Sequence, residues 1–244
     1  MDKMKIEIWS DIACPYCYIG KRKLENALSK VIGSENIELI WNSYELNPSL
    51  DKRPLEKNYF GYISEIHHIT EDDAKQDFEN IINTGKPVGI AFRPEIVKIT
   101  NTSDALRLIK LADKYNLADR AEEALFKAYF EEGKDISDTE TLVLTGSEIG
   151  VPRNDILRML NSHEYSDAIK DDMYRSENEL GLEYIPFYLI NNKYIIQGAI
   201  GETDYIKTIT EAYSDWKING TPDNTPLQNN AITGQSCSID GVCN

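Results

Sequence analysis

Two cysteines separated by two residues stand near the start of the chain, in the sequence CPYC at residues 14–17. An apolar run over residues 5–9 precedes them and alternates like a strand, and a helical pattern over residues 15–32 follows, with Gly33 as a stop signal. Two thiols at this spacing at the start of a helix can close a small disulfide. The motif therefore predicts thiol–disulfide chemistry.

The two thiols are expected to have different roles. The attacking species in exchange is a thiolate, which the free N–H groups and the dipole at a helix N-terminus stabilise. Cys14, at the helix tip, is therefore predicted to be the nucleophile with a lowered pKa. Cys17, one turn inside, is expected to be less exposed and to act as the resolving thiol. Tyr16, between them, is expected to tune the redox potential or to contact substrate.

Composition excludes several classes of function. The chain has 244 residues, of which 41% are hydrophobic and 27% charged, as in soluble globular proteins with one large domain or two small ones. A net charge of −15 argues against a nucleic-acid partner, because a phosphate backbone attracts the opposite sign. No stretch approaches the roughly 18 apolar residues of a membrane helix. The first strand follows the N-terminus so closely that we expect no signal peptide and a cytoplasmic location. In such a reducing compartment, cysteines arranged this way are more often catalytic, redox-sensing or metal-binding than structural.

The remaining pattern predicts a discontinuous α/β fold. A second strand over residues 37–44 would pair in parallel with the first. A β-hairpin over residues 186–190 and 194–198 and a helix over residues 203–216 come much later in the chain. All four strands are expected to share one mixed sheet.

Most of the intervening residues show helical periodicity. We therefore expect a domain made of residues 1–50 and 181–219, and an all-helical insertion domain, residues 51–180, that covers the cysteine end like a lid. Residues 220–244 are rich in Asn, Pro, Thr and Gly and are predicted to form a flexible tail without regular structure.

Four segments resemble a known family: Asp11–Gly20 (DIACPYCYIG), Ala128–Gly133 (AYFEEG), Gly181–Phe187 (GLEYIPF) and Cys237–Gly241 (CSIDG). The chain resembles the thioredoxin superfamily, specifically the DsbA-like branch with a helical insertion, and within it the FrnE-like group. The resemblance implies a thioredoxin-like fold and disulfide oxidoreductase activity without a cofactor or a metal.

The resemblance also implies that Pro186 follows a cis peptide bond and lies beside the disulfide. Such a proline turns the backbone of Ile185 toward the site, where it can pair with an extended substrate segment. Without the resemblance, Pro186 would simply start a strand. We expect Pro15, Tyr16, Ile185 and Pro186 to bind substrate.

The chain departs from the thioredoxin pattern at one position. Many thioredoxin-like proteins have a buried acid on the first strand, six residues before the nucleophile, where this chain has Ile8. Asp11 is nearer to the motif and either serves a related role or caps the loop, and it is not assigned as catalytic here.

A second cysteine pair, Cys237 and Cys243, lies in the tail with five residues between its members. A local disulfide here would close a short loop, add little stability and exchange readily. The pair is predicted to be a secondary redox centre that relays electrons to the CPYC pair or regulates it, the alternative being passive thiols. Four cysteines could also hold zinc, but Cys-x₅-Cys is unusual zinc spacing and Pro15 favours redox chemistry.

The sequence thus predicts a thiol–disulfide oxidoreductase or isomerase. Its partners would be protein or peptide thiols and disulfides, with glutathione or a thioredoxin-type reductant, and no membrane or nucleic acid. The alternatives are a glutathione-dependent isomerase or transferase of the kappa or hydroxychromene-carboxylate type, against which Cys17 argues, and a redox-responsive holdase chaperone.

Overall fold

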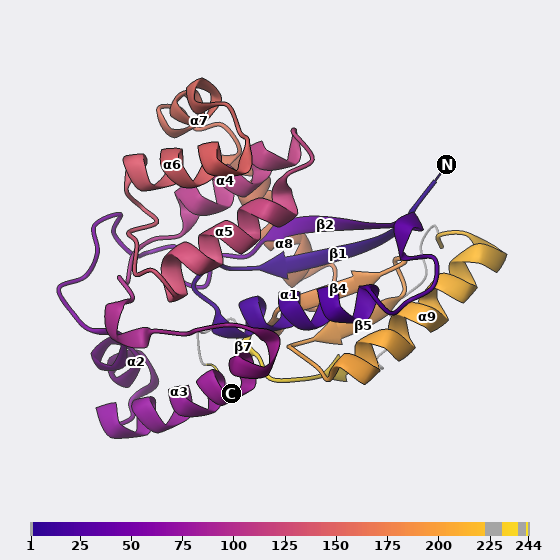
Figure 1. Cartoon of the computed structure of the whole chain (residues 1–244), viewed down its shortest axis with the longest axis horizontal. Coiled ribbons are helices and arrows are strands. Elements are labelled where there is room, and N and C mark those ends of the chain that lie inside the picture. The colour runs from indigo at the N-terminus through magenta and orange to yellow at the C-terminus, as the bar shows by residue number, and fades with distance from the viewer. Residues whose placement is uncertain (1, 223–230, 239–242, 244) are drawn as a thin grey trace.

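The computed structural model describes residues 2–222, 231–238 and 243. The main sheet has the strand order β2-β1-β4-β5-β6 (Figure 1). Its strands are β1 (Met4–Ser10), β2 (Ile37–Ser43), β4 (Phe187–Ile190), β5 (Tyr194–Gln197) and β6 (Ile232–Thr233). β1 is parallel to β2 and antiparallel to β4, so the predicted mixed sheet of strands from both ends of the chain is confirmed.

The hairpin forms because its turn residues tolerate a left-handed backbone. Asn191 and Asn192 have φ values of 51° and 52° in the turn between β4 and β5, which is closed by the Lys193 N–H donating to the Ile190 carbonyl at 3.1 Å. All four side chains of β4 are buried, as expected for a strand covered on both faces. Phe187 of β4 packs edge-on against Trp9 of β1, with 5.5 Å between ring centroids.

Two helices lie side by side against the sheet: α1 (Pro15–Leu28) and α9 (Glu202–Asn219) (Figure 1). A glycine lets α1 approach the hairpin closely. A Cβ at Gly20 would lie 2.4 Å from the Tyr188 hydroxyl oxygen and 2.9 Å from the Pro186 Cγ. The absence of a side chain at Gly20 therefore lets α1 lie directly against Pro186 and β4.

The region between β2 and the hairpin is helical, as predicted. Its helices are α2 (Tyr59–His67), α3 (Glu71–Gly85), α4 (Ser103–Asp113), α5 (Ala118–Phe130), α6 (Thr139–Ile149), α7 (Arg153–Leu160) and α8 (Ser166–Asn178). Short 3₁₀ turns cover Ser34–Asn36, Lys86–Val88 and Pro94–Ile96. Local capping sets several boundaries: Thr70 and Asp73 form a capping box, Asp138 accepts a hydrogen bond from the Thr141 N–H, and Gly150 ends α6 at φ 110°. The division into two domains stays a prediction. Among the described helices, none is long and apolar enough to cross a membrane.

The prediction that residues 220–244 lack regular structure is wrong for the part that the structure describes. β6 extends the main sheet, and β7 (Cys237–Ser238) pairs antiparallel with β3 (Tyr184–Ile185) in a second, two-stranded sheet. Residues 223–230 and 239–242 of this tail lie outside the described residues. The strands form because β5 and β3 offer free edges, which a local sequence pattern does not reveal.

Two backbone hydrogen bonds fasten the tail to the segment after β5. The Gly234 N–H donates to the Gln197 carbonyl at 2.8 Å, and the Ala199 N–H donates to the Gln235 carbonyl at 2.7 Å. Gly198 lies at this crossing with φ 89°, and a Cβ there would be 2.5 Å from the Gly234 carbonyl oxygen. A side chain at this position would therefore push the tail away from the sheet.

Gly198→Ala tests whether this contact holds the tail in place. Cys14 is 0% exposed, and its sulfur lies 3.1 Å from the Cys237 sulfur of the tail. The substitution should therefore increase the alkylation rate of Cys14 several-fold, because it displaces the tail. Gly181→Ala is the matched control, since Gly181 also has a positive φ (66°) but would place its Cβ in open space. Both variants should lose some stability. Equal alkylation rates of Cys14 in the two variants would show that the contact at Gly198 does not hold the tail in place.

Candidate redox site

The cysteine motif lies where the two parallel strands end. β1 and β2 stay in register as far as the Ser10–Ser43 pair, and the Tyr44 N–H then donates to the Ser10 carbonyl. Cys14 is the N-cap of α1, and its N–H donates to the Asp11 carbonyl at 3.0 Å. The predicted position of Cys14 at the helix tip is therefore confirmed.

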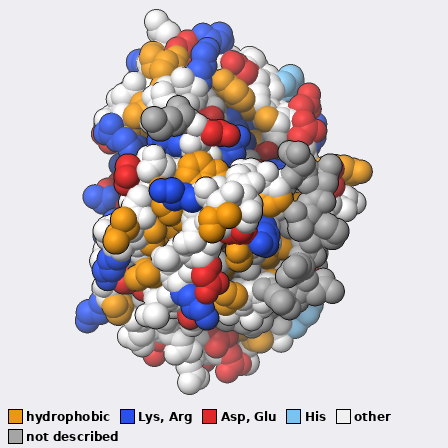
Figure 2. Space-filling model, turned by 90° about the vertical axis from the view of Figure 1, so that its right-hand side faces the viewer, with side chains coloured by type: hydrophobic (Ala, Val, Ile, Leu, Met, Phe, Trp, Pro, Cys, Tyr) orange, Lys and Arg blue, Asp and Glu red, His pale blue; other side chains and the backbone are white. Residues whose placement is uncertain are grey.

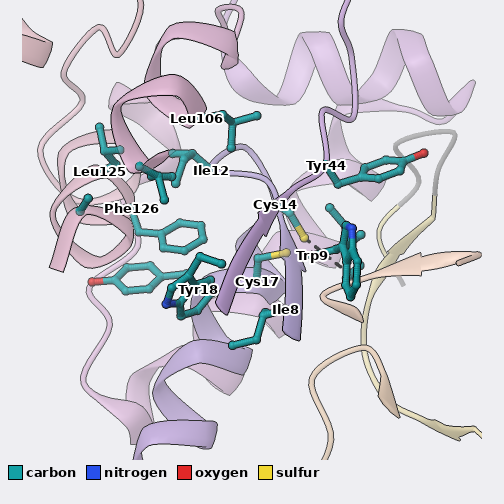
Figure 3. Close-up of a cluster of buried hydrophobic side chains, with 14 of the residues drawn as sticks. Ile8, Trp9, Ile12, Cys14, Cys17, Tyr18, Tyr44, Leu106, Leu125 and Phe126 are labelled. Carbon is teal, nitrogen blue, oxygen red and sulfur yellow. Dashed lines mark hydrogen bonds between the residues drawn. The ribbon is translucent and has the colours of Figure 1, made fainter. Parts of the chain in front are cut away.

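The two sulfur atoms of the motif point toward each other (Figure 3). Around them lie Trp9 on one side and the stacked rings of Tyr18 and Phe126, 4.9 Å apart, on the other (Figure 3). Burial raises the pKa of Cys17 well above its usual value, and the hydrogen bond and charge of Cys14 raise it further. Cys17 thus keeps its proton more readily than a solvent-exposed thiol, as a resolving thiol should.

The expectation that Cys17 is clearly less exposed than Cys14 is wrong. Cys14 is 0% exposed and Cys17 is 1% exposed. Cys14 is more buried than expected because the tail covers it: the Cys14 Sγ contacts the Cys237 Sγ at 3.1 Å. Exposure predicted from the helix end alone took no account of a strand from the far end of the chain.

The predicted tail pair is disulfide-bonded, and it lies at the motif. Cys237 and Cys243 form the disulfide, and Cys237 pairs with Ile185 across the β3–β7 ladder. The Ile185 carbonyl oxygen is 3.9 Å from the Cys14 Sγ. The structure therefore brings Cys14, Cys237 and Cys243 into one continuous series of sulfur atoms.

The residues expected to bind substrate follow Cys14 in the chain or lie at the strand that pairs with Cys237. The Ile185–Pro186 peptide bond is cis. Pro15 is the first residue of α1, and Tyr16 is only 3% exposed. Burial, followed by the charges of Cys14 and Asp77, raises the pKa of Tyr16 to about 12. Tyr16 is thus a neutral wall of the site at physiological pH.

Two hollows meet at Cys243. The first is an open groove of about 440 Å³ between α3 and the tail. Its lining includes Tyr16, Asp77, Asn80, Gln235 and Cys243. The groove is mostly polar and leads from the surface to the tail disulfide.

The second hollow is a smaller cavity of about 100 Å³ behind the disulfide. Apolar and tyrosine side chains dominate its wall, together with Asp11 and Cys243. The tyrosines are Tyr59 and Tyr62 of α2 and Tyr129 of α5. We refer to it as the Asp11 cavity.

Asp11 is the principal feature that the sequence did not assign. It is 1% exposed, and its carboxylate accepts hydrogen bonds from the Leu46 N–H at 2.8 Å and the Ala13 N–H at 3.3 Å. Burial raises its pKa to about 7, even though these hydrogen bonds and one with Thr102 oppose the shift. Its position just after the first strand and before the motif was the signal, but burial by α2, α5 and the segment before α4 could not be read from that position.

A second buried acid lies on α5. Glu122 is 1% exposed, and burial raises its pKa to about 8. Nearby, Lys21 of α1 is also 1% exposed and contacts Glu25 and Asp119, the latter at 2.9 Å. Because Asp119 belongs to α5, this ion pair joins the helix of the motif to the insertion.

The described residues contain no group of three or more His, Cys, Asp and Glu arranged for a metal. The face of the molecule in Figure 2 intersperses basic and acidic side chains among hydrophobic ones, and no continuous basic tract appears among the residues described there.

Comparison with known proteins agrees with this arrangement. The family model of the DsbA-like thioredoxin domain matches residues 5–223, so the chain belongs to the DsbA-like thioredoxin domain family. It is similar to the crystal structure of the probable DsbA oxidoreductase SCO1869 from Streptomyces coelicolor, with a TM-score of 0.81 and 26% identity over 99% of this chain and 98% of the other. The thioredoxin-like α/β fold expected from the sequence is thereby confirmed.

Two further proteins are more distant. The uncharacterized protein YwbO of Bacillus subtilis is 23% identical over 84% of this chain and 96% of its own length. The cytosolic disulfide reductase DsbM of Pseudomonas aeruginosa, solved with GSH, shares the fold with a TM-score of 0.57, at 13% identity over 88% of this chain and 98% of the other.

The raised pKa of Asp11 makes stability depend on pH. The folded state binds the Asp11 proton more tightly than the unfolded state does. The stability that this proton adds to the folded state is therefore complete below about pH 4 and is lost as pH rises to about 7. Between these limits the wild type should lose on the order of 4 kcal/mol of unfolding free energy relative to Asp11→Asn. Urea denaturation of both proteins from pH 4 to 8 measures the difference.

An exposed acid supplies the control for this measurement. Asp167→Asn changes a side chain that is 90% exposed, and its stability difference from wild type should be nearly constant over the same pH range. A pH-independent difference between wild type and Asp11→Asn would show that Asp11 titrates normally.

Proposed function

We propose that this protein is a thiol–disulfide oxidoreductase of protein or peptide substrates, in which the CPYC pair works together with the tail pair. The observation that carries the proposal is the 3.1 Å contact between the Cys14 Sγ and the Cys237 Sγ, the latter already bonded to Cys243. A nucleophilic sulfur in contact with a disulfide sulfur is the arrangement from which exchange begins.

The internal exchange balances in two steps. The Cys14 thiolate attacks the Cys237 Sγ, a Cys14–Cys237 disulfide forms, and Cys243 leaves as a thiolate. Cys17 then attacks the Cys14 Sγ, which forms the Cys14–Cys17 disulfide and releases Cys237, whose thiolate takes up the proton that Cys17 loses. The CPYC pair is oxidised by two electrons and the tail pair is reduced by the same two.

The burial of the motif supports an outer position for the tail pair in this relay. Cys14 is 0% exposed, whereas Cys243 is partly buried and lines the open groove beside Tyr16. An external thiol or disulfide therefore meets the tail pair first while the tail is in place. Electrons then pass between the tail pair and the CPYC pair inside the protein.

The tail also lies where a substrate segment would pair. β7 pairs with Ile185 immediately before Pro186, so a substrate that used the same backbone edge would have to displace it. We therefore infer two modes of action: relay through the docked tail, and direct attack of Cys14 on a substrate when the tail is displaced.

A small thiol or a thioredoxin-type protein would supply or remove the electrons. Glutathione is small enough to enter the groove at Cys243. The disulfide reductase DsbM, which shares the fold, has a structure solved with GSH. A cytoplasmic location fits a pair that must be reduced again after each turnover.

Serine substitutions in the CPYC pair separate this function from its alternatives. Cys14→Ser should lower reduction of a disulfide peptide by dithiothreitol to near background. Cys17→Ser should do the same while accumulating a Cys14–Cys237 disulfide, because no thiol remains to resolve it. Peptide mass spectrometry detects the linkage. Full turnover by Cys17→Ser with glutathione would instead favour a glutathione-dependent isomerase or transferase, and suppression of aggregation by a cysteine-free variant would favour a holdase.

Removal of the tail thiols tests the relay. The double variant Cys237→Ser/Cys243→Ser should retain disulfide exchange at Cys14 and Cys17 but change its rate with glutathione at least several-fold, since the outer pair is lost. Stopped-flow kinetics with glutathione and with a disulfide peptide measure both routes. Unchanged kinetics would make the tail thiols passive, and complete loss of activity would make them part of the primary catalytic centre.

A further inference from the structure

The Asp11 cavity contains a carboxyl group with no part in the exchange described above. Asp11 and Cys243 both line this cavity, and the sulfur of Cys243 is the group that leaves when Cys14 attacks Cys237. At about 100 Å³ it has room for a few water molecules or for a rotated Cys243 side chain. Asp11 is the acid in its lining, and the remaining described lining side chains are tyrosines, small polar residues and apolar residues.

A thiolate released into this cavity would be poorly solvated. Low-polarity walls disfavour the charged form of a thiol, and an ionised Asp11 would add repulsion between like charges. A protonated Asp11 would instead supply the proton that the sulfur needs. Its pKa of about 7 allows it to give and take a proton near neutral pH.

We propose that Asp11 is the proton donor and acceptor for Cys243 during exchange between the two cysteine pairs. This inference rests on the proposed relay. In the forward direction Cys14 attacks Cys237, the Cys237–Cys243 bond breaks, and the carboxyl proton of Asp11 passes to the leaving Cys243 sulfur, directly or through one water molecule. In the reverse direction the Asp11 carboxylate takes the proton from the Cys243 thiol, which then attacks Cys237 and expels Cys14.

The charged and titratable groups around Asp11 influence the pH at which its carboxyl loses its proton. Glu45 raises the pKa of Asp11 by charge repulsion, and Glu122 of α5 interacts with Asp11 through charge. The hydroxyls of Tyr59 on α2 and Tyr129 on α5 stay neutral, because burial raises the pKa of each above the usual value. The groups that face or adjoin the carboxyl from neighbouring elements are Glu45, Tyr59, Tyr62, Thr102, Glu122, Tyr129 and Cys243, with Cys14 and Cys17 on its own loop and helix.

The test follows Cys243 directly in a Cys17→Ser background, where exchange stops at the Cys14–Cys237 disulfide. Protein with its tail disulfide formed is held at pH 4 and then brought to pH 6.0–8.5 in increasing concentrations of N-ethylmaleimide. Peptide mass spectrometry gives the rate at which the Cys243 adduct appears, at the limit where it no longer depends on the reagent concentration. That limit is the rate of the first exchange step.

Asp11→Asn should slow this step about tenfold at pH 6, where the wild-type carboxyl is protonated. The ratio of the two rates should fall to one or below at pH 8.5, because the ionised carboxyl can no longer donate and repels the thiolate. The ratio cancels the ionisation of Cys14, which both proteins share. Asp11→Glu should restore the pH dependence of the ratio. Parallel pH profiles for Asp11→Asn and its parent would overturn the inference.

Three further variants keep the test decisive. Glu123→Gln is the matched control, since burial also raises the pKa of Glu123, but Glu123 neither lines the cavity nor acts on Asp11 through charge, and its profile should follow that of the parent. Thr102→Val keeps the carboxyl and removes a hydrogen bond that lowers its pKa, so its profile should shift to higher pH. This variant carries the test if Asp11→Asn does not fold, and an unshifted profile would then overturn the inference.

The last variant asks whether Asp11 acts on Cys14 and not on Cys243. In a Cys17→Ser/Cys237→Ser/Cys243→Ser background, Asp11→Asn should leave the pH profile of Cys14 alkylation unchanged, and a shift as large as the one seen with the tail would overturn the inference. Failure of the proposed relay gives a different result: no Cys243 adduct and no Cys14–Cys237 disulfide in any Cys17→Ser protein. Exchange that is unaffected by Asp11 rejects only the role of Asp11.

Discussion

The pairing of β7 with β3 is the contact on which the site depends. A ladder of two residues on each strand places Cys237 opposite Ile185 and its sulfur 3.1 Å from that of Cys14. So short a ladder contributes little stability on its own, and its position is secured by the hydrogen bonds of the tail to residues 197 and 199. The pairing of β7 with β3 therefore buries Cys14 and also places the Cys237–Cys243 disulfide against its sulfur.

Around this contact, the protein keeps ionisable groups away from water. Cys17, Asp11 and Glu122 are each no more than 1% exposed, and burial raises the pKa of each. Burying such groups opposes folding, which is why perturbed acids and thiols gathered at one place indicate function more than stability. The neutral forms of these groups are favoured at the site, and each ionisation during exchange therefore needs a nearby proton donor or acceptor.

The helical insertion supplies the walls that produce this environment. Tyr59 and Tyr62 come from α2, Tyr129 and Glu122 from α5, and the groove at Cys243 is lined by residues of α3. The ion pair of Lys21 with Asp119 links the helix that begins at Cys14 to α5. Movement of the insertion would thus alter the polarity around the sulfur atoms and access to them at the same time.

The sequence by itself determined the elements and the primary chemistry. The strand before the motif, the helix after it, the Asn191–Asn192 turn and the caps at Thr70 and Asp138 all follow from local rules, and the structure has them. The CPYC spacing was likewise sufficient to locate the paired thiols, because two cysteines on one helical turn are neighbours in any fold.

Only the tertiary structure decided what surrounds those thiols. Pairing of residues 237–238 with residues 184–185 joins segments more than 50 positions apart, and neither segment has a pattern that specifies the other. The burial of Cys14, the cavity between Asp11 and Cys243, and the raised pKa of Asp11 depend on the tail and on side chains of helices that are distant in the sequence. Solvent exposure and electrostatic environment are properties of the packed chain, so they could not be read from residue types and spacing.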